Sequence, residues 1–424
     1  MRGAFLFVCS AVLATATGAQ ERDVCRVNID SVGGSGQRIE TPRGLRFHGN
    51  RGVWVSCIDD LTRMFSDSIA GYQRFQRLDL IRRVHFDDGV VTLEADRASY
   101  FLNDQRLEAS GNVRLTNRRS GSVLVGPNLT YYRVAEGIRD SALMLATGRP
   151  TVHYQSLERG DAADTTDAYV IVGDRLRMVD DENAWAFGTV TIDRSDFSAR
   201  SDSAFLDTRV GQGELMGHAT VGGRADSSYT MNGATIAFRT VNDKLEWVQA
   251  RDDATAVSAA WDLAADTIEF AISNELVQGG IAWGRISRAT ARTAEYEMTA
   301  DSLEIDLPGQ QLQEIRGFGA AVAVTLADGV AEPDWIGGDS LTARFGDRDG
   351  RRVLNMLEAL GNARAFYRVY PNQPGALPGI NYSRGDRIIA SFGAAGIERV
   401  DVIGAADGVY LEPAAGPGTD GRND

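Results

Sequence analysis

The chain has 424 residues, of which 43% are hydrophobic and 24% charged, a globular composition that excludes a wholly disordered protein. Its net charge is −14 and its pI is about 4.9, so on average it repels nucleic acid and anionic membrane surfaces. No run of 18 apolar residues follows the first twenty positions, which argues against a transmembrane helix in the body of the chain. The 46 glycines and 10 prolines suit a chain that turns often.

Residues 1–19 have the features of a cleavable signal peptide. Arg2 supplies the positive start, Ala4 to Ala14 form a short apolar core, and Thr17-Gly18-Ala19 offer small residues for cleavage. A buried first strand is the alternative. The first interpretation predicts an exported, periplasmic protein that begins at Gln20.

Two cysteines, Cys25 and Cys57, remain after this segment is removed. In an oxidising compartment an isolated pair most simply forms a disulfide, and two free buried thiols are the alternative. Closing this loop would stabilise the N-terminal end by roughly 3–4 kcal/mol in the chain-entropy model.

One strand motif recurs along most of the chain. An alternating segment carries a small residue and an Asp, and the strand after the next turn carries a Gly. The clearest copy is Val91–Tyr100 followed by Leu107–Leu115, and further copies lie at 197–221, 298–324, 338–365 and 385–411. Weaker copies surround Asp67, Asn128, Asp174, Asn232 and Asp266. The anchor residues are 28 to 47 positions apart, and spacings of this order are typical of stacked repeats.

The alternation predicts strands with one apolar face, and the Gly predicts a bulge or tight bend in the second strand of each copy. A short helix near Leu354–Leu360 is an alternative to a strand there. If the apolar face lines a groove, the candidate lining residues are Val91, Leu93, Ala95, Leu107, Ala109, Val113, Phe205, Leu215, Leu303 and Ile305.

Three stretches interrupt or end the array. Residues 155–168 form a polar loop that could separate two units, residues 371–380 form a proline-containing loop, and residues 413–424 are expected to be disordered.

The residues give little sign of catalysis, and we predict no enzyme, metal or cofactor. The four histidines, His48, His85, His153 and His218, have no ligand at metal-binding spacing. The recurring Asp could bind calcium in a roll, but local hydrogen bonds to the backbone explain it more simply. Acidic pairs such as Asp252-Asp253 leave a polysaccharide-active enzyme as a distant alternative.

The repeated segments Leu93–Tyr100 and Leu107–Val113, with the ending Gly408–Pro413, resemble the OstA-like family of lipopolysaccharide-transport proteins, which includes LptA-like proteins and the N-terminal domain of LptD. The similarity covers roughly residues 45–412. It implies an all-β, elongated, folded-over β-jellyroll over residues 20–412, with an apolar groove for the acyl chains of lipopolysaccharide or a similar glycolipid. Related jellyroll proteins would join it end to end, forming a bridge between the inner and outer membranes.

The chain is much longer than a single-domain LptA-like protein and lacks the C-terminal barrel of LptD, so the resemblance predicts a soluble bridge. The alternative is an exported β-solenoid scaffold whose core is filled. Small Ala and Gly residues on the inner face favour the groove, whereas large packed residues would favour the scaffold.

Overall fold

The computed structural model describes residues 25–58, 60–155, 169–180, 182–195, 197–223, 229–241, 244–326, 333–348, 350–369, 377–393 and 396–412. These residues form 28 β-strands in one sheet and two single 3₁₀ turns, η1 (Gln73–Phe75) and η3 (Pro308–Gln310). The signal peptide predicted for residues 1–19 and the disordered tail predicted for 413–424 lie outside the described residues. The expectation of an all-β protein is confirmed.

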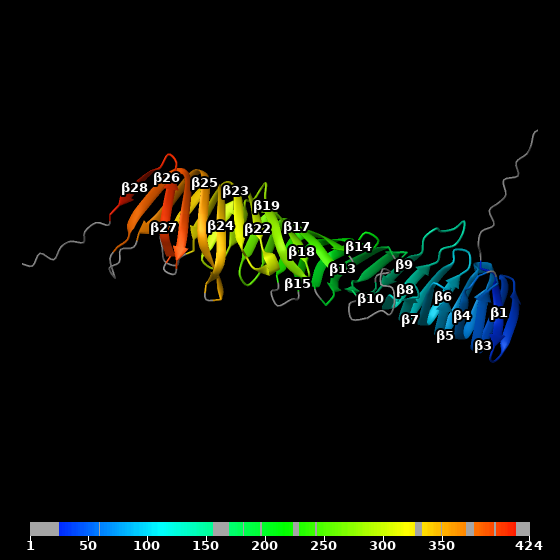
Figure 1. Cartoon of the computed structure of the whole chain (residues 1–424). Coiled ribbons are helices and arrows are strands. Elements are labelled where there is room, and N and C mark those ends of the chain that lie inside the picture. Colours follow the sequence, from blue (N-terminus) through cyan, green and yellow to red (C-terminus); the bar gives the residue numbers. More distant parts are fainter. Residues whose placement is uncertain are drawn as a thin grey trace, which may run out of the picture.

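The strands follow one another along an elongated molecule, from β1 at one end to β28 at the other (Figure 1). The first fourteen are β1 (Val27–Val32), β2 (Gly36–Thr41), β3 (Gly44–Cys57), β4 (Arg63–Tyr72), β5 (Arg77–Asp87), β6 (Val91–Phe101), β7 (Arg106–Asn117), β8 (Val123–Tyr132), β9 (Leu143–Thr147), β10 (Thr151–Tyr154), β11 (Tyr169–Val172), β12 (Arg175–Val179), β13 (Asn183–Asp193) and β14 (Phe197–Asp207).

The remaining strands are β15 (Gln212–Gly223), β16 (Thr230–Val241), β17 (Lys244–Val257), β18 (Asp262–Ser273), β19 (Leu276–Trp283), β20 (Ala289–Arg292), β21 (Tyr296–Ala300), β22 (Ser302–Asp306), β23 (Glu314–Thr325), β24 (Trp335–Arg348), β25 (Arg351–Val369), β26 (Gly379–Gly393), β27 (Gly396–Ile403) and β28 (Asp407–Leu411). Residues 354–360 lie within β25, so the alternative of a helix there is wrong.

Every pairing is antiparallel, and most strands pair with their two neighbours in sequence. The exceptions are short strands that occur in couples, and each couple takes the place of one long strand. For example, β9 and β10 both pair with β8, and β11 and β12 both pair with β13. A boundary between two units was predicted near residues 155–168, of which 156–168 lie outside the described residues, and the strands on either side of it are hydrogen-bonded to each other through β10 and β11.

Each long strand bends near its middle, where the pairing register shifts. Between β6 and β7 the shift lies between Glu94 and Arg97. We call the two sides of this bend arm A and arm B. In β6, arm A is Val91–Ala95 and arm B is Arg97–Phe101, and every other strand is divided by its pairing with these arms.

An Asp and a Gly with positive φ meet at six of these bends. The pairs are Asp96 with Gly111, Asp174 with Gly188, Asp202 with Gly217, Asp301 with Gly319, Asp339 with Gly361, and Asp386 with Gly404. A Cβ on any of these glycines would lie 2.3–2.5 Å from the Asp Oδ2. Glycine is therefore required both for its φ, which lies between +70° and +80°, and for the space it leaves. The predicted bend at the Gly of the motif is confirmed.

The side chain of the corner Asp makes local hydrogen bonds. Asp266 accepts three backbone N–H groups, from Arg285, Ile286 and Ser287, at 2.6, 2.7 and 3.1 Å. At other bends the partner is the side chain that follows the glycine, as when Asn112 Nδ2 donates to Asp96 at 2.9 Å, or an arginine, as when Arg288 donates to Asp301 at 3.2 Å. Over the described ranges, no group of three or more His, Cys, Asp or Glu side chains could hold a metal ion.

The inner faces of the two arms form one continuous apolar core. Buried residues connect from Cys25 at one end to Ala390 at the other. Because alternate strand residues point to the same face, each strand contributes every second residue to this core, and the phase of the alternation resets at the bend. In β6 the buried residues are Val91, Leu93 and Ala95, then Ala98 and Tyr100.

The predicted disulfide is present. Cys25, just before β1, is bonded to Cys57 at the end of β3, with a Cα–Cα distance of 5.2 Å. It fastens the beginning of the described chain to arm A next to β4.

Candidate functional site

Nine of the ten predicted lining residues lie in the interior between the arms. They are Val91, Leu93, Ala95, Leu107, Ala109, Val113, Leu215, Leu303 and Ile305, and none is more than 7% exposed. The two-residue alternation thus predicted their direction. Whether they contact a lipid stays a prediction.

Phe205 is the exception. It lies between Ala204, which is buried, and Leu206, which packs against the core. Phe205 is therefore on the outer face of arm B, where its ring stacks on that of Trp185 at 5.2 Å. The strand alternation of the sequence did not predict this direction, because the alternation resets at the bend around Asp202, between the two halves of β14. Phe205 also belongs to the lining of the apolar pocket between the arms, so its contact with a lipid stays a prediction.

The free ends of the two arms lie opposite the bends and meet along one side of the molecule, and we call this seam the mouth. The hairpin turns around Asp60 and Asp88 form the rim of arm A. The turn containing Gln105 and the end of β8 form the rim of arm B. The contacts across this mouth determine where the interior is closed.

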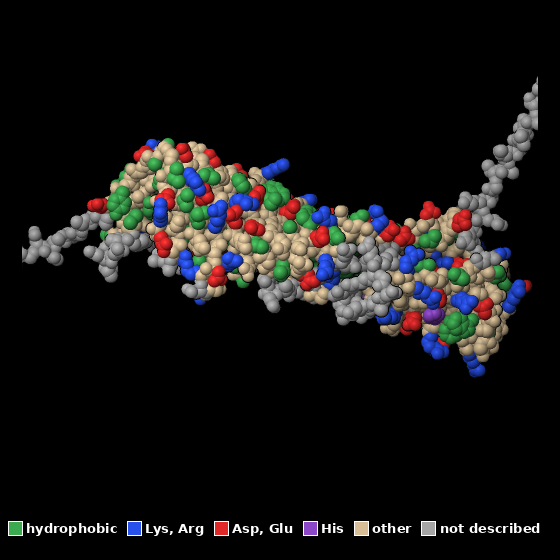
Figure 2. Space-filling model, in the orientation of Figure 1, with side chains coloured by type: hydrophobic (Ala, Val, Ile, Leu, Met, Phe, Trp, Pro, Cys, Tyr) green, Lys and Arg blue, Asp and Glu red, His purple; other side chains and the backbone are tan. Residues whose placement is uncertain are grey.

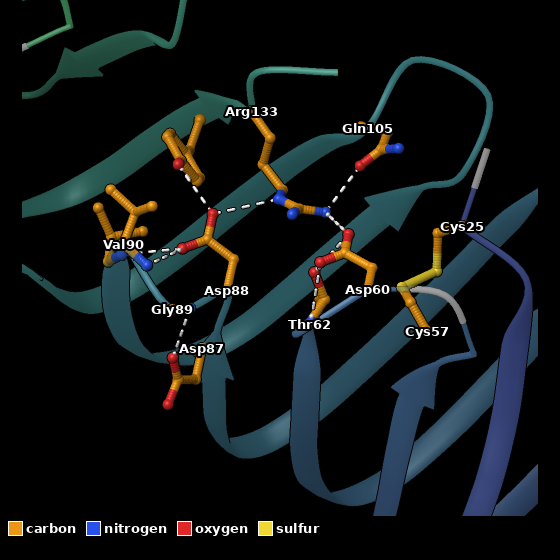
Figure 3. Close-up of polar contacts among 12 residues, drawn as sticks. Cys25, Cys57, Asp60, Thr62, Asp87, Asp88, Gly89, Val90, Gln105 and Arg133 are labelled. Atoms are coloured by element: carbon orange, nitrogen blue, oxygen red, sulfur yellow. Dashed lines mark hydrogen bonds and ion pairs between the residues drawn. A yellow bond between two sulfur atoms is a disulfide. The ribbon is translucent and has the colours of Figure 1, made fainter. Parts of the chain in front are cut away.

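A buried ionic cluster closes the mouth in the N-terminal third (Figure 3). Arg133, from the rim of arm B, donates to two carboxylates on the rim of arm A, to Asp60 at 2.6 Å and to Asp88 at 3.1 Å. The same guanidinium donates to Gln105 Oε1 at 2.7 Å, and the Tyr131 hydroxyl donates to Asp88 at 2.9 Å. We call Arg133, Asp60, Asp88, Gln105 and Tyr131 the clasp.

The clasp is almost dry. The side chains of Arg133, Asp60 and Asp88 are 10%, 17% and 3% exposed. Asp88 also accepts the backbone N–H groups of Val90 and Val91 at 3.0 and 2.8 Å, which fixes the turn that carries it. A charge network in this position is stable only while each member keeps its partners.

The members of the clasp shift the pKa values of one another. Burial alone would raise the pKa of the Asp60 carboxyl, but hydrogen bonds from Arg133 and Thr62 and the Arg133 charge hold this pKa below its usual value. Burial, reinforced by the neighbouring Asp88 carboxylate, raises the pKa of Tyr131. The Asp60 carboxylate, the Arg133 guanidinium and the neutral Tyr131 phenol therefore keep their forms at neutral pH.

Aromatic contacts close other parts of the mouth. Phe86 of arm A lies 5.9 Å from Tyr100 and 6.3 Å from Tyr131, both in arm B. Farther along the chain, Phe270 of arm B meets Tyr229 and Trp261, which lie at the rim of arm A, at 5.7 and 5.8 Å. Near the C-terminal end, Tyr296 and Phe392 meet at 5.6 Å, and burial raises the pKa of Tyr296 to about 12.

In the middle of the molecule, where Figure 1 shows β10, β13 and β14, the aromatic contacts differ from those described above. The aromatic pairs stay within one arm. Tyr169 meets Tyr154 and Phe197 in arm A, and Trp185 meets Phe205 in arm B. Between the arms lies an apolar pocket, the waist pocket, whose lining includes Val152, Ile171, Met178, Ala186, Ala204 and Leu206.

A row of alanines explains this pocket. Ala186 is paired with Ala204 across β13 and β14, and Ala184 is paired with Leu206. Ala184, Ala186 and Ala204 occupy inward positions of arm B where other strands carry larger side chains such as Leu215 or Ile236. A second apolar pocket between the arms lies near the C-terminal end, beside Tyr296, Leu357 and Phe392.

Among the described residues, both ends of the array are open, since β1 and β2 pair only with β3, and β27 and β28 pair only with β26. Exposed apolar residues lie on the terminal strands, including Ile29 and Ile39 at one end and Val409 and Leu411 at the other. Open edges with apolar side chains are typical sites of strand pairing with a partner.

On the face seen in Figure 2, acidic and basic side chains are interspersed along the whole length. No helix among the described residues is long and apolar enough to cross a membrane.

The clasp was not predicted from the sequence. The sequence patterns singled out none of Asp60, Asp88 and Arg133. One signal was present, because Leu129, Tyr131 and Arg133 continue the same inward phase of β8, so that an arginine follows on the apolar face. A charged residue on such a face needs a buried partner.

Comparison with family models and with curated proteins found no match for this chain. The class of protein defined by the geometry is therefore an all-β repeat protein with a continuous apolar interior between two arms of one sheet.

Proposed function

We propose that this chain is an OstA-like, folded-over β-jellyroll that carries lipopolysaccharide or a similar glycolipid across the periplasm, with the acyl chains between arm A and arm B. The observation that carries the proposal is the uninterrupted apolar interior from Cys25 to Ala390, which opens into an apolar pocket at the waist. A carrier of acyl chains needs such a path, and it needs no catalytic group.

The energetics support a lipid ligand. Each buried CH₂ group contributes about 0.8 kcal/mol, so a chain of about twelve carbons gains on the order of 10 kcal/mol before entropy costs. The acidic surface is no obstacle, because this gain comes from the interior. Acyl chains bound in this way could exchange along the length without breaking any directional bond.

The ends of the molecule suit a bridge. The open edges at β1–β2 and β27–β28 could each pair with the edge of another jellyroll, extending the interior from one protein to the next. The disulfide Cys25–Cys57 supports an oxidising compartment such as the periplasm.

One observation favours a second function. The nine interior candidates are at most 7% exposed, as expected for a β-solenoid scaffold with a filled core. In a carrier, the arms would have to separate to admit a chain, whereas in a scaffold they would stay together.

Lipid bound to the purified full chain separates the two functions. The protein is extracted gently from the envelope of cells that export it, and native mass spectrometry measures its mass before and after incubation with lipopolysaccharide. A carrier retains or acquires a glycolipid adduct of defined mass. Protein that stays free of lipid in both samples would rule out the carrier and leave the scaffold.

A further inference from the structure

The outer face of arm B is hollowed over strands β5 to β9, which lie in the N-terminal third of the molecule (Figure 1). The hollow has a volume of about 630 Å³, and small-molecule sites occupy roughly 300–1,000 Å³. Its floor consists of two rows of outward side chains that run across the strands, between buried residues such as Leu80 and Leu129. We call this feature the outer hollow.

The row nearer the mouth offers hydrogen-bond acceptors that are fixed in place. It consists of Asp79, Ser99, Glu108 and Thr130, which are paired in succession across β5, β6, β7 and β8. Arg77 donates to both oxygens of Asp79, at 2.6 and 2.8 Å, and the Ser99 hydroxyl donates to Asp79 Oδ1 at 2.7 Å. Asp79 Oδ2 keeps a lone pair for a ligand, and the Glu108 side chain is 47% exposed.

The row nearer the bend has unused hydrogen-bonding capacity. It consists of Arg97, Ser110, Asn128 and Thr147, which are paired in succession across β6, β7, β8 and β9. Within the described part of the chain, none of these four side chains makes a hydrogen bond or an ion pair, and neither does that of Thr130. Together they present guanidinium donors, an amide, and hydroxyls that both donate and accept.

An alternating row of arginines and aromatic rings walls the hollow on the side of the mouth. The row consists of Arg46, Tyr72, Arg77, Phe101, Arg106 and Tyr132, each paired with the next across neighbouring strands. Each arginine lies 4.1–5.9 Å from the centre of an adjacent ring, so the side chains hold one another in place. Asp79 follows Arg77 by two residues, which places the hollow about 7 Å from this wall at the rim of arm B.

The mixture of groups selects one class of ligand. The charged lining residues are two arginines, Arg77 and Arg97, and two acids, Asp79 and Glu108, so the hollow has no net charge and does not favour a polyanion. An acyl chain would remove water from these charges without replacing its hydrogen bonds. A ligand rich in hydroxyl groups can donate to the carboxylates and accept from the guanidinium and amide groups at the same time. Carbohydrates have this chemistry.

We propose that the outer hollow binds an uncharged oligosaccharide, which lies across β5 to β9 with its hydroxyl groups on the two polar rows. This inference goes beyond the proposed function, because it assigns a ligand to the outer face of arm B and not to the interior. The sugar comes from one of two sources, a free glycan or the head group of a glycolipid. The second source rests on the proposed function, since the head group then reaches the hollow over the rim of arm B while the acyl chains lie between the arms.

Saturation-transfer NMR with the purified full chain tests the site. The probes are neutral tetrasaccharides of glucose and of galactose, and the oligosaccharide released from lipopolysaccharide by mild acid, with and without its phosphate groups. Thr130→Tyr fills the hollow, and Glu108→Gln removes one charged acceptor while keeping the side-chain shape. The matched control is Thr235→Tyr, because Thr235 is a half-buried outward residue of β16 in arm B, outside the hollow.

We expect a neutral oligosaccharide to bind the native chain and Thr235→Tyr with equal affinity, Thr130→Tyr at least ten-fold more weakly and Glu108→Gln at least three-fold more weakly. Displacement of this oligosaccharide by intact lipopolysaccharide would assign the site to the head group, and binding that persists would assign it to a free glycan.

Equal affinity of folded Thr130→Tyr and the native chain would overturn the site, and binding of the phosphorylated oligosaccharide alone would overturn the ligand class. If no oligosaccharide binds while the chain still retains a lipid adduct, this inference fails and the carrier stands. If a neutral oligosaccharide binds a chain that never takes up lipid, the carrier fails and the outer hollow stands.

Discussion

The corner pair of Asp339 and Gly361 allows a quantitative test of why the repeat carries its glycine. Gly361→Ala places a methyl group in a backbone with φ +70°, at a position 2.4 Å from Asp339 Oδ2. The left-handed conformation costs an alanine roughly 1–2 kcal/mol. The clash must also displace Asp339, which accepts hydrogen bonds from Asn362 Nδ2 at 3.0 and 3.1 Å, worth together about 1–2 kcal/mol.

The expected loss of stability is therefore about 2–4 kcal/mol. Gly350→Ala is the matched control, since Gly350 has φ +76° and a Cβ there would meet nothing within 4 Å. It should cost only the conformational part, about 1–2 kcal/mol. Because a repeat array can unfold in parts, hydrogen exchange of the β24–β26 amides is the suitable assay, supported by urea unfolding.

A second variant isolates the contact. In an Asp339→Ala background the 2.4 Å contact with Oδ2 is removed and the contact with the Cβ at 3.0 Å stays, so Gly361→Ala should cost less than in the native background and approach the cost of Gly350→Ala. Equal losses for Gly361→Ala and Gly350→Ala in the native background would refute the corner contact, and the glycine would then be explained by its φ alone.

Three further predictions concern the disulfide, the clasp and the waist. Breaking Cys25–Cys57 with reductant or by Cys57→Ser should lower the stability of the β1–β4 region by about 3–4 kcal/mol, measured by hydrogen exchange, and an unchanged exchange rate would contradict this. The pKa of Asp60 is lower in the folded chain than the ordinary Asp value of 3.8, so its stabilising contribution is complete above that pH and is lost as the pH falls through the folded pKa. The melting temperatures of the native chain and of Asp60→Asn should thus differ by the same amount at pH 7 and pH 5 and become equal toward pH 3. Equal melting temperatures already at pH 5 would contradict the lowered pKa of Asp60. Ala186→Leu fills the waist pocket and should reduce lipid capture at least five-fold while costing about 1–3 kcal/mol of stability, whereas undiminished capture would place the lipid elsewhere.

Much of the fold could be predicted because the repeat imposes local rules. Alternation determined that Val91, Leu93 and Leu303 point inward, and the Gly of each copy marked the bend. Phe205 could not be assigned in this way, because the bend at Asp202 shifts the phase of the second half of β14. Whether Phe205 faces inward or outward is decided by the pairing register with the neighbouring strands, and the sequence of one strand does not contain that register.

The clasp could not be predicted from the sequence for a different reason. Asp60, Asp88 and Arg133 lie in three separate turns, up to 73 residues apart, and meet only after both arms have folded. Each residue alone is an ordinary turn or strand-end residue. The inward phase of Arg133 predicts that it needs a partner, but it cannot tell which carboxylate supplies one.

The most direct test of lipid transport is photo-crosslinking along β22 in cells that export the protein. A photoreactive residue is placed in turn at Ser302, Leu303, Glu304 and Ile305, and crosslinked glycolipid is measured. Leu303 and Ile305 face the interior and are 0% and 5% exposed, whereas Ser302 and Glu304 face outward. Lipid passing between the arms predicts capture at Leu303 and Ile305 but not at the two outward positions. Capture that does not alternate along the strand, or no capture at any position, would contradict the account.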